Sequence, residues 1–365
     1  MSLTRSQELL AELVRIASIS GDEDAIATFV TDLIVDAGLD CERIGNTVLA
    51  RYGKSGGPRL LLNTHLDTVP VGEGWTCDPF AAQWTDGQLF GRGSNDAKAS
   101  VAAMLTSLFE LAAAGSKLPG EVWLALNERE ETDNFGMGRT LERLGNPDLA
   151  ITGEPTGLEV VRAQSGLAVL IAEWKGRSCH AAHVAHVEHT NALLVAAQEM
   201  QQTGPYGVLD GTHPLIGDST IAPTVLHAGE RHNVVPDHAE ATFDARLAPP
   251  FAGADAMKWL RERMPSAELR LRSDRLRAVE TPADHPLVQA ALTCASKPEA
   301  IGSRTLSDMA LLPGVPAIKC GPGATERSHT PDEFVLASEV EEGTQFYSAI
   351  IPAALEAVCS AGTTA

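Results

Sequence analysis

Residues 59–67 read Arg-Leu-Leu-Leu-Asn-Thr-His-Leu-Asp, and this stretch places reactive side chains directly after an apolar run. The leucines predict a buried strand over 59–64. In α/β proteins, binding and catalytic groups lie at the carboxyl ends of such strands. His65 and Asp67 are two residues apart, so in an extended chain both point to the same face. His65 can then bind a metal ion while Asp67 orients it, although the pair alone leaves open which of the two is the ligand.

Around this stretch the chain alternates between strand and helix patterns. The expected strands are 47–51, 59–64, 121–127 and 149–153, and the expected helices are 6–17, 22–37, 97–114 and 140–144. Such alternation is typical of an α/β domain with a largely parallel sheet.

The pattern changes after about Glu159. Strand-like runs at 167–174, 219–227, 239–246 and 269–276, with helices near 191–201 and 254–264, predict an α+β insert with an antiparallel sheet. Alternation resumes with helices at 286–296 and 338–358 and a strand at 315–320. We therefore predict a catalytic domain formed by 1–160 and 278–365, interrupted by a second domain at 161–277.

Composition excludes several classes of protein. The 365 residues are 44% hydrophobic and 21% charged, an ordinary globular composition with length enough for two domains. The net charge of -20 argues against a nucleic-acid partner, which clustered Lys and Arg would bind. We expect no membrane span and no secretory signal, and hence a cytoplasmic protein. The six cysteines are far apart and show no CxxC pair, so we expect free thiols.

Four further clusters carry acids or histidine. They are GRGSNDAK (91–98) with Asp96, the pair Glu130-Glu131 after a predicted strand, GEPT (153–156) with Glu154, and SHTPDE (328–333) with His329. Each has a plain structural explanation: a helix N-cap for Asp96, a solvated turn for the acid pair, a turn at Glu154, and a surface histidine at 329.

Together the clusters supply two histidines and several carboxylates at predicted sheet edges. Imidazole and carboxylate without thiolate suit zinc, cobalt or manganese in a hydrolytic site with an open position. More than four ligands suggests two metals that share a bridging carboxylate. In the pair Glu130-Glu131, one acid can bind metal while the other acts as general base, and Glu128 nearby complicates this assignment.

The motifs HLDTVP, GRGSNDAK, the acid pair, GEPT, NVVP and SHTPDE occur in an order that resembles the co-catalytic zinc deacylases and peptidases. That family includes acetylornithine deacetylase, succinyl-diaminopimelate desuccinylase and glutamate carboxypeptidase, and the resemblance covers nearly the whole chain. It implies a zinc-peptidase-like catalytic domain with a mostly parallel central sheet, interrupted by an α+β dimerisation (lid) domain, in a homodimer.

The resemblance also implies a role for each motif residue. His65 and Glu154 match ligands of one metal, Glu131 and His329 match ligands of the second, Asp96 matches the bridging carboxylate, Glu130 the general base, and Asp67 the carboxylate that orients His65. Two divalent ions are implied, most typically zinc, which cobalt or manganese can replace.

Further matches concern the substrate. His180 matches a residue that reaches the partner's active site in the dimer and stabilises an oxyanion, Asn233 and Arg246 match substrate contacts, and Gly321 and Gly323 match a loop lining the substrate site. The chain departs from the family after His180, where residues 181–189 carry extra histidines, so His183 is an alternative for this role. The chain also departs from the family at Arg129, where an acid is common. Two glycines, Gly136 and Gly138, follow the acid pair, so the spacing between the acids and the family's glycine is not fixed by the match.

We therefore expect a metal-dependent amidohydrolase that removes the acyl group from a small N-acyl amino acid. The segments SDMALLPGVPA and GPGATERSHTPDE most resemble acetylornithine deacetylases. Succinyl-diaminopimelate desuccinylase and a dipeptidase or carboxypeptidase of the same family stay open as alternatives. A non-catalytic metal-binding scaffold is the remote alternative, since every catalytic position is filled.

Overall fold

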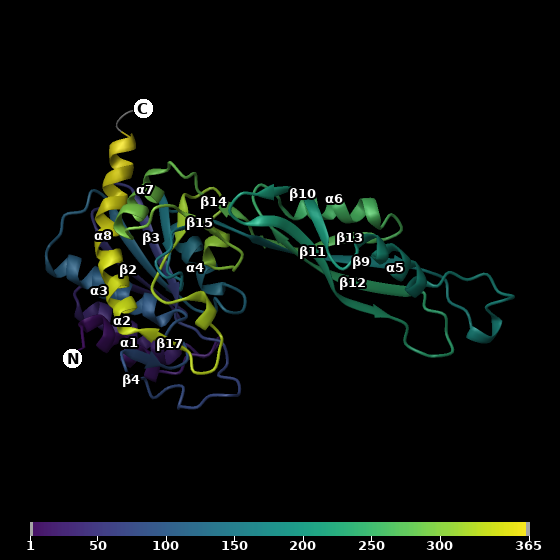
Figure 1. Ribbon diagram of the computed structural model, residues 1–365, viewed down its shortest axis with the longest axis horizontal. Helices are drawn as coiled ribbons and strands as arrows, with labels where there is room; N and C mark the ends of the chain where they lie inside the picture. The colour runs from purple at the N-terminus through teal and green to yellow at the C-terminus, as the bar shows by residue number, and fades with distance from the viewer. Residues whose placement is uncertain (1–2, 363–365) are drawn as a thin grey trace. The chain divides into compact units, whose positions relative to one another are not determined.

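The computed structural model describes residues 3–362, and in it the chain divides into two compact units (Figure 1). Unit 1 comprises the chain up to Arg162, Glu280–Ile301, and the chain from Ser307 onward. Unit 2 comprises Ala163–Val279 together with Gly302–Leu306. Each unit has its own hydrophobic core.

Unit 1 is built on a mixed sheet with a parallel centre. The strand order is β1 (Asp40–Ile44), β2 (Thr47–Gly53), β6 (Glu121–Asn127), β3 (Arg59–His65), β7 (Leu149–Thr152), β16 (Ala317–Lys319), β8 (Val161–Gln164) and β14 (Val279–Glu280), with β15 (Ile301–Ser303) beside β8. The four strands β6, β3, β7 and β16 run parallel, whereas β1, β2 and β8 pair antiparallel. The predicted fold class is confirmed.

Helices cover both faces of this sheet. The main core joins alternate strand residues such as Leu60, Leu62 and Leu124 to the helices α1 (Arg5–Arg15), α2 (Asp24–Asp36), α3 (Lys98–Ala113), α7 (Pro286–Cys294) and α8 (Ala337–Gly362). The other face carries α4 (Phe135–Leu144) and the short 3-10 helix η3 (Asp308–Leu311). Because both faces are covered, Leu60, Leu61 and Leu62 are all buried, as a central parallel strand requires.

A second, small sheet in unit 1 positions one of the predicted motifs. It has the order β17 (Phe334–Leu336), β5 (Gln88–Phe90) and β4 (Gln83–Thr85). Phe334 pairs with Phe90, so SHTPDE lies next to the loop that carries Asp96. A 3-10 helix, η4 (Thr325–Arg327), precedes the motif.

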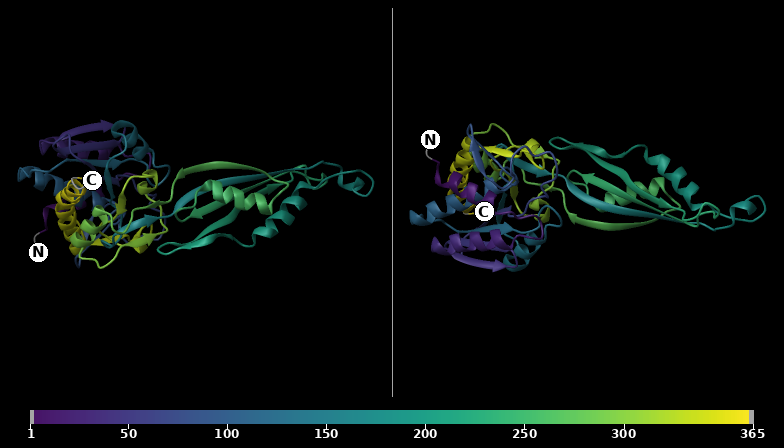
Figure 2. Two further views of the ribbon diagram at one scale, coloured as in Figure 1. Left: turned by 90° about the horizontal axis from the view of Figure 1, so that it is seen from above. Right: turned by 90° about the horizontal axis from the view of Figure 1, so that it is seen from below.

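Unit 2 is an antiparallel sheet with helices on one face. The strand order is β10 (Gly207–His213), β11 (Gly217–Ala228), β12 (His238–Leu247), β9 (Gly166–Lys175) and β13 (Glu268–Leu276). The helices α5 (Ala192–Met200) and α6 (Gly253–Arg263) share a core with alternate residues of β9 and β12. The ribbon views of Figure 2 show these helices lying along the strands of the sheet. The short helices η1 (Ala181–His183) and η2 (Gln201–Thr203) complete the unit.

The strands that the sequence did not predict are short or half exposed. They are β1, β4, β5, β8, β10, β14, β15 and β17. β1 is polar and half exposed along its length, so it has no apolar alternation to detect. Helix α4 begins five residues before the predicted position, because the two glycines in its first turn resemble a loop.

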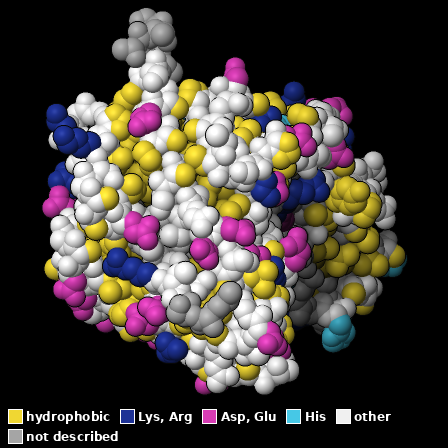
Figure 3. Space-filling model, turned by 60° about the vertical axis from the view of Figure 1, so that its left-hand side comes forward, with side chains coloured by type: hydrophobic (Ala, Val, Ile, Leu, Met, Phe, Trp, Pro, Cys, Tyr) yellow, Lys and Arg dark blue, Asp and Glu magenta, His cyan; other side chains and the backbone are white. Residues whose placement is uncertain are grey.

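The surface in Figure 3 carries acidic side chains scattered among basic, polar and apolar ones. The excess of acid is thus distributed over that face rather than gathered in one patch. All six cysteines lie within the described residues and are free thiols. Over residues 3–362, every helix is too short or too polar to cross a membrane.

Candidate metal centre

Neighbouring parallel strands bring the predicted site residues of unit 1 to one sheet edge. His65 is the last residue of β3 and pairs with Asn127, the last residue of β6. Glu130 and Glu131 lie three and four residues after Asn127. On the other side of β3, Asn63 pairs with Thr152 at the end of β7, and the next turn carries Glu154.

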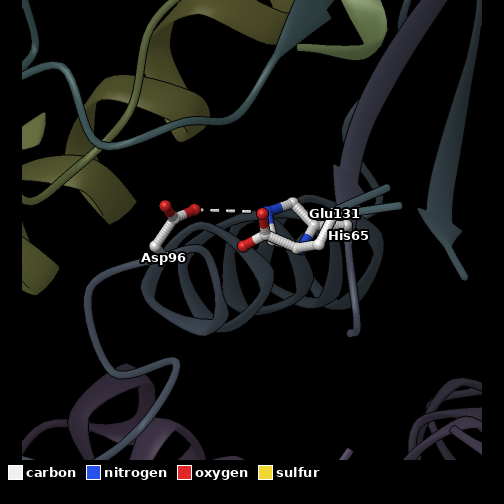
Figure 4. Close-up of side chains that lie close together, drawn as sticks. All are labelled: His65, Asp96 and Glu131. Atoms are coloured by element: carbon white, nitrogen blue, oxygen red, sulfur yellow. Dashed lines mark hydrogen bonds and ion pairs between the residues drawn. The ribbon is translucent and has the colours of Figure 1, made fainter. Parts of the chain in front are cut away.

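His65, Asp96 and Glu131 form a group in which one ligand atom from each lies within 4.8 Å of the others (Figure 4). Asp96 lies between two imidazoles: His65 Nε2 is 3.2 Å from Asp96 Oδ1, and His329 Nε2 is 3.5 Å from Asp96 Oδ2. His329 Nε2 is also 3.0 Å from Glu131 Oε1. One carboxylate with an imidazole at each oxygen is the arrangement expected of a bridging ligand.

Glu154 comes two residues after the end of β7, the strand next to β3, and makes no hydrogen bond to His65, Asp96, Glu131 or His329. Its negative charge adds to the hydrogen bonds of Asp67 and Asp96 that raise the pKa of His65, and to the burial that raises the pKa of Glu130. Burial raises the pKa of Glu154 itself to about 8; the positive charge of His65 opposes the shift and the charge of Asp96 adds to it.

Asp67 holds three residues of the centre in place: His65, Glu130 and Glu131. Its buried carboxylate accepts hydrogen bonds from the backbone N–H groups of Glu130 (3.0 Å) and Glu131 (3.1 Å) and from the hydroxyl of Ser20 (2.7 Å). Asp67 Oδ1 lies 3.6 Å from His65 Nδ1, and the backbone carbonyl of Asp67 is 2.9 Å from the same nitrogen. Asp67 therefore links the orientation of the imidazole to the position of the acid pair, a task typical of residues that hold metal ligands in place.

The centre gathers several buried carboxyl groups, and a bound cation would offset their mutual repulsion. Burial alone lowers the pKa of His65, but hydrogen bonds to Asp67 and Asp96 outweigh it and leave the pKa well above the usual value. Burial and then the charge of Glu154 raise the pKa of Glu130 well above the usual value. Several converging carboxylates with two imidazoles and no thiolate are a donor set that fits divalent zinc, cobalt or manganese.

Glu333 fixes the loop that carries Asp96. Its carboxylate is 1% exposed and accepts hydrogen bonds from the backbone N–H groups of Gly93 (3.1 Å), Asn95 (2.9 Å) and Asp96 (3.0 Å). Arg92 adds an ion pair of 2.7 Å to the same carboxylate. The motif SHTPDE thus has two roles. His329 lies beside Asp96 and Glu131, and Glu333 fixes the backbone of Asp96 by accepting its N–H.

Sequence reasoning did not assign Glu333, Lys319 or Asp308. Glu333 stood inside a recognised motif, and its three backbone partners lie some 240 positions away in the chain. Lys319 ends β16 and is 3% exposed; burial lowers its pKa, and the carboxylate of Glu154 partly opposes the shift. Asp308 is 1% exposed, and burial raises its pKa to about 6. Lys319 ends a short apolar run, whereas Asp308 and Glu333 each stand directly before one, and a charged residue in such a place is a weak signal of a functional role.

The predicted loop residues Gly321 and Gly323 have a packing reason to be glycine. A Cβ at Gly321 would lie 2.7 Å from the backbone oxygen of Glu154, and one at Gly323 would lie 2.4 Å from Asn95 Oδ1. Gly323 also has φ of +90°, which favours glycine. Their proposed contact with substrate stays a prediction.

The predicted residues of unit 2 fall into two places. His180 and Asn233 are neighbours. The backbone N–H of Ala181, the residue after His180, donates to the carbonyl of Asn233 at 2.9 Å. His180 is exposed, accepts a hydrogen bond at Nδ1 from Ala182 N (3.1 Å), and has its ring 5.7 Å from that of His183. Arg246 lies near the other end of β12, where its guanidinium pairs with Asp244 at 2.7 Å.

Known proteins resemble this chain in sequence and in fold. Residues 61–353 match the Peptidase family M20/M25/M40. Succinyl-diaminopimelate desuccinylase from Cereibacter sphaeroides is 29% identical over 276 residues, which is 70% of this chain and 70% of that protein. The protein of that name from Acidiphilium cryptum is 30% identical over 273 residues, covering 70% and 71%.

Solved structures extend the similarity in fold to nearly the whole chain. An M20 family metallo-carboxypeptidase from Sulfolobus solfataricus has a TM-score of 0.76 at 17% identity, covering 97% of this chain and all of that one. A Bacillus subtilis protein described as a dinuclear metal-binding peptidase of the M20 family has a TM-score of 0.75 at 17% identity, covering 96% and 98%. Because the family match spans most of the sequence, this protein belongs to Peptidase family M20/M25/M40, and the predicted class, a metal-dependent hydrolase of amide bonds, is confirmed with it.

Proposed function

We propose that this protein is a dimetal amidohydrolase that removes the acyl group from a small N-acyl amino acid. The observation that carries the proposal is the position of Asp96, whose two oxygens each face an imidazole, with the acid pair beside it. We propose His65 and Glu154 as ligands of one ion, Glu131 and His329 as ligands of the other, and Asp96 as the ligand they share. Bound there, divalent cations would polarise the scissile carbonyl and make a water molecule more acidic.

The chain's own residues supply the proton transfers. We propose that the Glu130 carboxylate takes a proton from the attacking water and passes it to the nitrogen of the leaving amine. Glu130 is held on two sides, because Asp67 accepts its backbone N–H and Asn134 donates to its Oε1 at 3.2 Å. A base held in this way needs little rearrangement to reach both the water and the amine.

N-succinyl-diaminopimelate is the first substrate to test, because the curated relatives reported above are named for its desuccinylation. N-acetylornithine is the second, because SDMALLPGVPA and GPGATERSHTPDE most resemble acetylornithine deacetylases. We propose that Arg246 in unit 2 binds a substrate carboxylate through the N–H groups that its two hydrogen bonds to Asp244 leave over.

A substrate panel tests this proposal. We expect the protein to hydrolyse at least one of N-succinyl-diaminopimelate, N-acetylornithine and a set of dipeptides, and expect a chelator to abolish the activity and added zinc, cobalt or manganese to restore it. The measurement is amine release, with total metal determined in the same samples. Two bound metals with every amide left intact would refute the enzymatic proposal and favour a metal-binding scaffold.

We further propose a homodimer formed through unit 2, in which His180 serves the partner's active site. Large apolar side chains are exposed on unit 2 at Leu194 (62%) on α5 and at Val225 (42%) and Leu226 (44%) on β11, and a second subunit packed against them would remove apolar surface from water.

Mixing two inactive variants tests this arrangement. Glu130→Gln and His180→Ala should each be nearly inactive alone. After random subunit exchange, about a quarter of wild-type activity should return, because half the dimers would carry one complete site. Light scattering should give twice the chain mass. A monomeric mass, or a mixture as inactive as its parts, would contradict the proposal, and His183→Ala is the matched control.

A further inference from the structure

Asp308 is a buried carboxylate that lies behind the acid pair and is outside the predicted set of metal ligands and substrate contacts. Its side chain accepts three hydrogen bonds, all from asparagine amides: Asn127 at 2.6 Å and Asn63 at 3.4 Å on Oδ2, and Asn134 at 3.1 Å on Oδ1. Asn63 belongs to β3, Asn127 ends β6, and Asn134 precedes α4. One carboxylate thus connects the two central strands to the start of the helix that follows the acid pair.

Asn134 connects this carboxylate to Glu130. The same nitrogen, Asn134 Nδ2, donates to Asp308 Oδ1 at 3.1 Å and to Glu130 Oε1 at 3.2 Å. An asparagine amide nitrogen carries two hydrogens, so both are used, one on each carboxylate. Asn134 is 7% exposed and has φ of +51°, a left-handed backbone conformation that asparagine adopts more readily than most residues.

The orientation of this amide depends on Asp308. An ionised carboxylate only accepts hydrogen bonds, so it requires the NH₂ side of Asn134, and not its carbonyl oxygen, to face inward. The NH₂ group is then aimed at Glu130 as well. If residue 308 could donate, the amide of Asn134 would gain by turning over, and its carbonyl oxygen would then face the carboxylate of Glu130 and repel it.

We propose that Asp308 is a positioning residue for the general base: it fixes the Asn134 amide, which in turn holds one oxygen of Glu130 and leaves the other for proton transfer. This inference rests on the proposed role of Glu130. Within residues 3–362, the side chain of Glu130 accepts its hydrogen bond from Asn134. Loss of this bond would therefore free the carboxylate to rotate. Holding a base in its reactive geometry is a recognised contribution to rate.

A double-mutant cycle separates this role from a purely structural one. We expect Asp308→Asn and Asn134→Ala each to lower kcat about 10- to 100-fold, with KM within about twofold and unchanged metal content. Because both changes interrupt the same connection, the double variant should be no slower than the slower single variant. Effects on kcat that multiply, or wild-type kcat in Asp308→Asn, would overturn the proposal.

Thr140→Val is the matched control. The Thr140 hydroxyl donates to Asn127 Oδ1 at 2.9 Å, so its loss disturbs the network on the side that does not reach Glu130. We expect this variant to unfold at a lower temperature and to keep its kcat. A loss of kcat equal to that of Asp308→Asn would show that general loosening explains the effect.

A second measurement needs no activity and no folded Asp308 variant. In the wild-type protein, both side-chain amide protons of Asn134 should exchange slowly with solvent in nuclear magnetic resonance spectra, since both are hydrogen bonded. The resonance is identified by its absence in Asn134→Ala. Fast exchange of either proton would overturn the proposal. If the wild-type protein hydrolyses no amide, the proposed function fails, whereas slow exchange of both protons would still support the link between Asp308 and Asn134.

Discussion

Replacing Glu130 by glutamine is expected to lower kcat by about 10²- to 10⁴-fold while the protein keeps its metal. Glutamine has the shape of glutamate and can still accept the hydrogen bond from Asn134, but it cannot take up a proton from water at neutral pH. His65, Asp96 and Glu131 form the group that can hold a metal, and Glu130 is outside it, so ligation should persist. Steady-state kinetics on the best substrate of the panel, with metal analysis of the same sample, is the measurement.

Two matched variants make this result specific. His65→Ala should empty one metal position, whereas Asp67→Asn should reduce metal affinity or rate only in part, because Asp67 acts by orienting His65 and the acid pair. Full activity in Glu130→Gln would refute its role as base. Loss of metal in Glu130→Gln, at the level of His65→Ala, would instead identify Glu130 as a ligand.

Replacing Glu333 by alanine is expected to destabilise the protein by about 3–5 kcal/mol, because it leaves the buried guanidinium of Arg92 without its carboxylate partner. The two side chains of the pair Arg92–Glu333 are 3% and 1% exposed, and their charged atoms are 2.7 Å apart. The same change removes the acceptor for three backbone N–H groups in the turn before α3. Urea unfolding, followed by circular dichroism, gives the free energy directly.

A surface ion pair serves as the control for Glu333. Arg143 and Glu42 lie 2.8 Å apart with side chains 48% and 39% exposed, so Glu42→Ala should change the unfolding free energy far less than Glu333→Ala does. Equal effects would show that burial of the Arg92–Glu333 pair is not what stabilises the turn. Reduced metal affinity in a folded Glu333 variant would further indicate that the turn positions Asp96.

The centre of the fold could be predicted because local sequence and buried environment agree there. The apolar runs that end at Thr64, Asn127 and Thr152 are each buried on both faces, and polar residues begin directly after them. This pattern specifies a central parallel strand with little ambiguity, and parallel strands bring their ends to one edge. The acids and histidines that follow these runs are therefore expected to lie near one another at that edge.

The supporting residues could not be predicted in the same way. Glu333 contacts a turn some 240 positions earlier, and Asp308 contacts Asn63, Asn127 and Asn134 from a 3-10 helix of four residues. Nothing in the residues next to Asp308 indicates three amide partners, since the partners are set by the tertiary fold. The strands β4, β5 and β17 are three residues each, too short for alternation to show.

The chain leaves unit 1 at Arg162 and returns at Glu280, and these residues lie side by side on neighbouring strands. The guanidinium of Arg162 pairs with Glu280 at 2.7 Å, and Thr281 N donates to the carbonyl of Arg162 at 2.8 Å. The chain also leaves unit 1 after Ile301, on β15, and β15 pairs with the same strand β8. Because these exits lie on neighbouring strands, a change of length within unit 2 is expected to leave the parallel strands of unit 1 in place. A change at His180, Asn233 or Arg246 would still alter the proposed reaction, so the two units can vary independently in length but not at these positions.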